Sequence, residues 1–459
     1  MLKYIILYVV NTVLCLNILD FSTFFVANLI YLLGMVVVCG SNKRKNISLN
    51  IIKLYHTIYW VGFIYILLCY SYMVSQNYEY LLAYDVYNYF MPKVYEFLSL
   101  GGVKEAWDYN WQNFNLFSRY QSGYFGYLIP FAFISKYFDS NIYISMQLSS
   151  LLIGSFSSIV IYKIFLLNNF KFFNAYKYTL LICIFSILFL YSTLLLRDIV
   201  VMFFYLLGIM YTFKKEFSFL DILKIILVIL ISCTLRVETG LFLFYLIPLY
   251  LYLTMQTSRK KDIVIFSSII FISTLLLFLL IFYSQIFNVV TANNDIYLDS
   301  DKGDGVVGFL QNIPIIGSIL SIFYNAIQPI PLWVKLDESF DLSRPEAYNI
   351  MAFPISIGGG FNWIVISFIV SFILIRKIRF KVLSQISNPL IFNLFFGFLF
   401  LYIQSSVISQ RRLMAYYVLF YIFSILIAQN ISLADRKKIL FLAFLFYFLL
   451  NSLLTVFML

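Results

Sequence analysis

Charged residues are scarce in this sequence, and their scarcity excludes a soluble protein. Only 12% of the 459 residues are charged, while 62% are hydrophobic. An ordinary soluble domain has roughly 25% charged residues. A soluble fold cannot use that much apolar surface, so we expect residues 1–459 to form a single transmembrane domain with no substantial soluble part.

Other absences narrow the chemistry. The five cysteines show no metal-ligand spacing, and we identify no Walker-type phosphate loop, dinucleotide fingerprint or internal repeat. No metal, no cofactor and no ATP-driven pumping are therefore expected. The net charge of +11 does not indicate nucleic acid, because the basic residues sit in short loops between apolar runs. The only histidine, His56, begins an apolar run on the expected inner side, which excludes histidine catalysis on the outer face.

Apolar runs of about 17 to 25 residues recur along the chain, and each can cross a hydrocarbon core of about 30 Å as a helix. They predict an all-α polytopic membrane protein with about 13 transmembrane helices, in a range of 12 to 14. The expected spans cover 2–19, 21–39, 54–74, 142–166, 178–196, 199–213, 221–236, 239–255, 263–283, 352–375, 388–408, 413–429 and 439–457. The shorter run 122–137 contains Pro130, and we interpret it as a re-entrant or interfacial helix.

The distribution of basic residues predicts the orientation. Short cytoplasmic loops carry the excess of lysine and arginine, and with this span count every basic cluster falls on one side. Two long connections, about 76–141 and 284–351, then face outward, and the second is rich in aspartate and glutamate. The clusters are Lys43-Arg44-Lys45, Lys171 with Lys177, Lys214-Lys215, Arg259-Lys260-Lys261, Arg376 to Lys381 and Arg436-Lys437-Lys438.

Three outer turns carry arginine, although the orientation rule disfavours cations there. They are Arg197 with Asp198, Arg236 with Glu238, and Arg411 with Arg412. Guanidinium groups bind phosphate oxygens bidentately and stay charged, so these turns are candidates for binding an anionic substrate. The alternatives are ion pairs that cap the first two turns and lipid headgroup contacts at the third.

The first outer loop supplies further candidates. Asp85 lies near the outer end of a span, where a carboxylate can act as a general base. A later stretch combines Trp107, Trp111 and Arg119 with tyrosine and asparagine, a mixture suited to stacking on sugars and bonding their hydroxyls. Aromatic residues also populate any membrane interface, so lipid contact is the alternative.

This layout resembles the bacterial repeat-unit polymerases of the Wzy type, which extend O-antigen or capsule chains. More distantly, it is similar to the multi-span glycosyltransferases that use polyprenyl-linked donors. The matching features are the segment from Asp85 to Tyr89, the Arg197-Asp198 turn, the Arg236 turn and the Arg411-Arg412 motif ahead of a late span. The lipid A-core ligases differ, because they are thought to use an outer histidine, which this chain lacks.

The resemblance implies a multi-pass protein of the bacterial inner membrane that joins undecaprenyl diphosphate-linked oligosaccharide units on the outer face. It implies that Arg197, Arg236, Arg411 and Arg412 hold the diphosphate. Asp85 or Glu238 would deprotonate the acceptor hydroxyl. The implied partners are the lipid-linked oligosaccharide and membrane lipid, with a chain-length regulator and a flippase as candidate protein partners.

Two other functions remain open at this point. A single-sugar membrane glycosyltransferase with a polyprenyl phosphate donor would also use an acidic residue in the first outer loop, and it could need a metal. A flippase or transporter for the lipid-linked oligosaccharide is the second. Transporters often show repeated halves and polar groups at the bilayer midplane, whereas the charged groups here are expected at outer helix ends.

Overall fold

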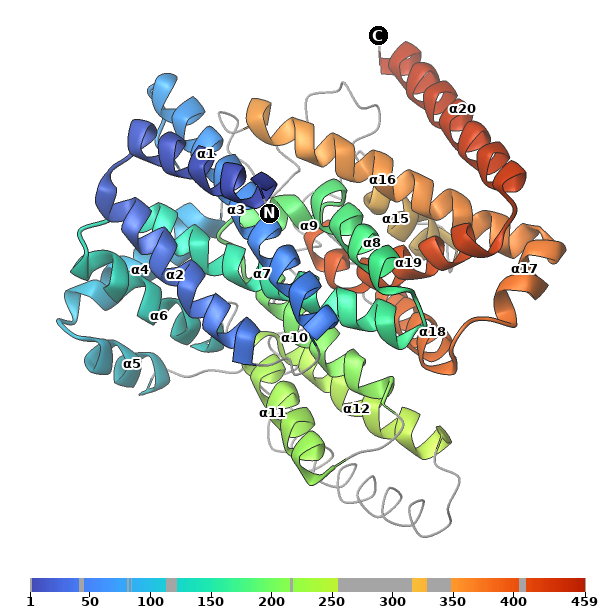
Figure 1. Ribbon diagram of the computed structural model, residues 1–459, viewed down its shortest axis with the longest axis horizontal. Helices are drawn as coiled ribbons and strands as arrows, with labels where there is room; N and C mark the ends of the chain where they lie inside the picture. Colours follow the sequence, from blue (N-terminus) through green and yellow to red (C-terminus); the bar gives the residue numbers. More distant parts are fainter. Residues whose placement is uncertain are drawn as a thin grey trace.

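The computed structural model in Figure 1 is a bundle of helices. It describes residues 2–40, 45–80, 82–83, 85–112, 122–214, 218–254, 316–327, 348–403 and 410–458. All regular elements within these ranges are helical, and none is a strand, which confirms the all-α prediction. In chain order they are α1 (Leu2–Ile18), α2 (Phe21–Gly40), α3 (Lys45–Ser75), η1 (Val86–Phe90), α4 (Met91–Ser99), α5 (Val103–Gln112), α6 (Ser122–Tyr137), α7 (Ile142–Leu167), α8 (Phe172–Phe185), α9 (Leu188–Thr193), α10 (Arg197–Thr212), α11 (Phe219–Leu235), α12 (Val237–Thr254), α15 (Ile316–Ile327), α16 (Tyr348–Leu374), α17 (Arg376–Leu383), α18 (Asn388–Ile403), α19 (Gln410–Asn430) and α20 (Leu433–Met458).

Several helices are suited to a membrane. Within the described ranges, four are long and apolar enough to cross one: Phe21–Gly40, Leu49–Ser75, Ile142–Leu167 and Ile350–Leu374. Shorter apolar helices accompany them, and α20 lies at the edge of the bundle beside α16 with many exposed large apolar side chains. The total of 13 spans is not confirmed and stays a prediction, and the expected span 263–283 lies outside the described residues.

Helix α7 is the centre of the bundle, where α2, α3, α6, α8, α9 and α10 pack against it. Small side chains allow this close packing. A β-carbon on Gly154 would come within 2.4 Å of the Ser192 β-carbon on α9. The buried hydroxyls of Ser155 and Ser157 donate to carbonyl oxygens of their own helix, at 2.8 and 2.9 Å. These two serines are thus satisfied within α7, and the helix surface remains available for packing.

Among the described residues, the basic turns that follow α7 and α10 lie at one end of the bundle. Three hydrogen bonds connect helix ends there: Tyr4 with Tyr176, Ser387 with Asn168, and Asn393 with Thr212. The starts of α1, α8 and α18 therefore adjoin the ends of α7 and α10. The basic helix α17 lies at the same end of the bundle, because only a short turn connects it to the start of α18. The described residues Lys171, Lys214 and Arg376 to Lys381 thus share one end, whereas the clusters at 41–44 and 259–261 lie outside the described residues and the orientation stays a prediction.

The span expected at 178–196 is not one helix. Helix α8 ends at Phe185, Ser186 is extended, and α9 begins at Leu188. The Ser186 hydroxyl accepts a hydrogen bond at 3.2 Å from the amide of Leu188, the first residue of the new helix. Hydropathy cannot detect such a break, because the run stays apolar through it. Irregular backbone of this kind is tolerated at membrane depth where protein buries it, and Ser186 is buried.

Helix α6 runs antiparallel to α7. The tight turn between them contains Asp139, which has a positive φ of 50°. The Tyr127 hydroxyl donates to the Ser149 carbonyl oxygen at 2.7 Å. The first residues of α6 therefore lie beside the middle of α7 and not at either end of it. At 16 residues, α6 is about 24 Å long, short of a bilayer core. This geometry is consistent with the re-entrant helix expected at 122–137.

Candidate functional site

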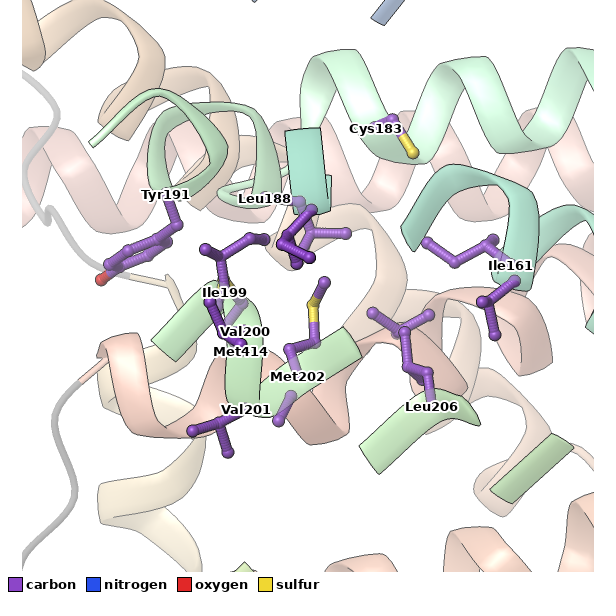
Figure 2. Packing of buried hydrophobic residues seen from close by; sticks show 14 of the residues in the cluster. Ile161, Cys183, Leu188, Tyr191, Ile199, Val200, Val201, Met202, Leu206 and Met414 are labelled. Atoms are coloured by element: carbon purple, nitrogen blue, oxygen red, sulfur yellow. The ribbon is translucent and has the colours of Figure 1, made fainter. Parts of the chain in front are cut away.

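Three helices begin close together, and each carries arginine at or next to its start. Helix α10 packs against both α12 and α19, and Phe242 of α12 lies edge-on to Tyr416 of α19 with ring centroids 6.3 Å apart. Figure 2 shows Met414, in the second turn of α19, beside Ile199 and Val200 in the first turn of α10. The unpaired amides and the dipole of a helix N-terminus attract anions. We call this meeting point of the three helix starts the arginine junction, comprising Arg197, Asp198, Arg236, Glu238, Arg411 and Arg412.

The structure brings two of the expected residues into direct contact. The guanidinium of Arg236 donates to the Asp198 carboxylate at 2.6 Å, and the two side chains are only 16% and 7% exposed. Sequence analysis had placed them in separate turns, 38 residues apart. The buried pair favours the structural alternative for Asp198, because its carboxylate oxygen is occupied by Arg236. Asp198 is therefore better suited to orienting the arginine than to binding substrate.

Arg236 also faces a second carboxylate and a tyrosine. Glu238 lies within electrostatic range of the Arg236 guanidinium, in addition to Asp198. Tyr416 of α19 lies within electrostatic range of Arg236, and its side chain hydrogen-bonds with Thr239 of α12. Glu238 itself is exposed. Of the expected junction carboxylates, Glu238 is thus the one that solvent or a substrate can reach.

Arg197 is the first residue of α10 and is half-buried. It lies close to Tyr124 of α6, which also adjoins Asp198 and Ser150 of α7. Ser150 is eight residues into α7, or roughly 12 Å along its axis from Ile142. The arginine junction is therefore recessed relative to the first turn of α7. The sequence predicts these turns only as outer turns between neighbouring spans.

The segment that follows α3 reaches the same region. Asp85 precedes η1 directly and is half-buried. Phe90, at the other end of η1, packs edge-to-face on Tyr124 with ring centroids 5.1 Å apart. Since Tyr124 adjoins Arg197, the segment that carries Asp85 passes close to the junction. This proximity keeps Asp85 as a candidate base.

The remaining expected residues are placed only in part. Arg411 and Arg412 lie in the first turn of α19, and their side chains are outside the described residues, as is Arg119. Arg412 and Tyr416 are four positions apart on this helix, so they share a face. Tyr416 approaches Arg236. The backbone of Arg412 therefore lies one helical turn from Tyr416, toward the start of α19.

Helices α4 and α5 are held together by polar contacts. Glu96 accepts hydrogen bonds from Lys93, at 2.7 Å, and from Tyr109. Burial opposes the charge on Glu96, but these two partners prevail and lower its pKa from 4.5. Lys93 also lies 4.7 Å from the centre of the Tyr109 ring. These contacts fix the position of α5, which carries Trp107 and Trp111.

Trp107 and Trp111 do not form an open platform for stacking sugars. They line one wall of a groove of about 510 Å³ between α5, α6 and α11. The other lining residues are glycine, proline and mostly apolar side chains, namely Gly123, Gly126, Tyr127, Pro130, Phe131, Leu230, Ile231 and Thr234. We call this the tryptophan groove. Its apolar lining favours a hydrocarbon over a carbohydrate.

Sequence analysis missed Tyr124, Thr239 and Tyr416. None belongs to a motif, and tyrosine is too frequent here, at 38 residues, to attract notice. One signal was present, because Thr239 follows Glu238 directly and Tyr416 follows Arg412 by four residues. No protein-family model, curated protein or solved structure matches this chain.

Proposed function

We propose that this chain is a membrane glycosyltransferase that polymerises undecaprenyl diphosphate-linked oligosaccharide units into O-antigen or capsular polysaccharide. In this proposal the reaction takes place on the outer face of the bacterial inner membrane. The observation that carries it is the arginine junction, where three helices that carry arginine in their first turn or just before it begin close together, next to an exposed carboxylate.

Support for an anionic substrate comes from the charge balance of the junction. The starts of these three helices carry four arginines and two carboxylates in the sequence, and Asp198 pairs with Arg236. Three helix N-termini add partial positive charge in the same place. A diphosphate has enough negative charge and enough oxygen atoms to satisfy such a site.

The chemistry that follows is a direct displacement. The acceptor hydroxyl oxygen attacks the anomeric carbon of the donor sugar, and the bond from that carbon to the diphosphate oxygen breaks. The electron pair leaves with the diphosphate, whose developing charge the arginines stabilise. The proton of the hydroxyl passes to Glu238 or Asp85 and then to water. Diphosphate is a good leaving group, so no general acid is required.

The test is the length distribution of the surface polysaccharide on a gel. A strain with this gene deleted is complemented by the wild type, by Arg411→Ala, or by Arg379→Ala. The last is a matched control, since Arg379 lies on α17 at the basic end of the bundle. We expect the wild type and Arg379→Ala to restore a ladder, and Arg411→Ala to leave a single repeat unit.

Other outcomes discriminate among functions. A ladder that persists after deletion would refute the proposal. A glycan shifted uniformly in every band would indicate a single-sugar transferase instead. Purified protein in nanodiscs, given lipid-linked repeat units alone, should make the same ladder without a nucleotide.

A further inference from the structure

The tryptophan groove lies directly against the arginine junction. Thr234, in its lining, is two residues before Arg236, and Gly123, also in its lining, precedes Tyr124. A β-carbon on Gly123 would come within 2.6 Å of the Thr234 carbonyl oxygen. Glycine is therefore required for this close approach of α6 to α11. The contact joins the groove to the charged site without an intervening element.

The groove offers almost no hydrogen-bonding capacity to a ligand. The Thr234 hydroxyl donates to the Ile231 carbonyl at 2.8 Å, and the Tyr127 hydroxyl donates to the Ser149 carbonyl at 2.7 Å. The rest of the lining is apolar apart from the tryptophan nitrogens. A sugar in this groove would lose hydrogen bonds to water without replacement. A hydrocarbon chain would lose none.

The size and the walls fit a chain better than a compact ligand. A volume of about 510 Å³ lies within the range of small-molecule sites. Trp107 and Trp111 follow one another by four residues on α5, with ring centroids 5.8 Å apart, so they form one continuous aromatic wall. Leu230, on the opposite wall, is 59% exposed, so the groove opens at the surface of α11.

We propose that the tryptophan groove binds the hydrocarbon chain of the lipid-linked substrate, at the end of the chain nearest its phosphate. The apolar groove then continues the arginine junction, so a single amphiphile occupies both. The proposal rests on the proposed function for the identity of the substrate. It assigns Trp107 and Trp111 to the lipid carrier instead of the sugar.

Photo-cross-linking tests this assignment. The probe is a polyprenyl monophosphate with a diazirine on the isoprene unit next to the phosphate, added to the purified protein in nanodiscs. A phospholipid with a diazirine in its acyl chain serves as the comparison for bulk lipid. Cross-linked peptides are identified by mass spectrometry, with and without excess unlabelled polyprenyl diphosphate. We expect competed cross-links in α5, α6 and α11 with the polyprenyl probe only.

Two tryptophan substitutions sharpen the result. Leu230→Trp fills the groove, whereas Leu223→Trp adds the same side chain two turns away on α11, at a leucine that is also exposed but does not line the groove. We expect Leu230→Trp to reduce cross-linking about tenfold and Leu223→Trp to leave it unchanged. Gly126→Leu fills the groove from α6 and should act like Leu230→Trp.

The outcomes separate this inference from the proposed function. Competed cross-links confined to other helices, or equal labelling by the phospholipid probe, would overturn the groove assignment. If polymerisation by Leu230→Trp and Gly126→Leu matched the wild type, the groove would be refuted while the polymerase stood. Competed cross-links in the groove of a protein that makes no polymer would support the groove and refute the polymerase.

Discussion

Breaking the ion pair between Asp198 and Arg236 should destabilise the protein strongly. Both side chains are largely buried, and the nitrogen and oxygen are 2.6 Å apart. Removing one member of a buried pair leaves an uncompensated charge and typically costs about 3–5 kcal/mol. We therefore expect Asp198→Leu and Arg236→Met each to lower the free energy of unfolding by about that amount.

The double substitution should behave differently from the sum of its parts. With both charges gone and apolar side chains in their place, most of the lost stability should return. Activity should not return, because the junction lacks one of its arginines. The assay is unfolding of the purified protein in detergent, followed alongside polymer formation, for all four members of the cycle.

The pair of Lys93 and Glu96 provides the control within the same chain. Its side chains are 27% and 40% exposed, and an exposed pair of this kind contributes about 0.2–1 kcal/mol. If the Asp198–Arg236 cycle gave a coupling energy no larger than the Lys93–Glu96 cycle, the burial of the junction pair would be refuted. A double variant as unstable as the worse single variant would contradict the reasoning as well.

Three further predictions follow from other parts of the fold. Gly154→Ala should destabilise the protein by about 1–3 kcal/mol through overpacking against α9. Gly360→Ala should not destabilise it, because a β-carbon there would meet nothing within 4 Å. Thermal unfolding of the two variants tests this difference. Charged Glu96 stabilises the contact of α4 with α5 above pH 4.5, and this stability should be lost as pH falls through the lowered pKa of Glu96. Proteolysis between α4 and α5 should then increase, and Glu96→Gln should remove this pH dependence. In a cysteine-free background, Tyr137→Cys should react with an impermeant maleimide added outside intact cells. Phe173→Cys should react only after permeabilisation. The reverse pattern would overturn the orientation predicted from the basic residues.

Hydropathy located most helices correctly because each apolar run is a local property of the chain. The expected spans 2–19, 21–39 and 142–166 agree with α1, α2 and α7 to within one residue. The same criterion missed the break at Ser186, because one serine with extended backbone inside an apolar run looks in the sequence like any other serine in a helix. It also could not show that α6 starts beside the middle of α7, which depends on packing between them.

The composition and the order of charges determined that this chain is helical, apolar along its length and arginine-bearing at three turns. Hydrophobicity, helix length and charge are properties that residues carry before folding. Only the tertiary structure decided which of those turns meet, that Asp198 is paired with Arg236, and that Trp107 and Trp111 face an apolar groove. Each of these depends on contacts between residues far apart in the chain, whose geometry is set by how α5, α6, α10, α11 and α19 pack, and no local pattern encodes it.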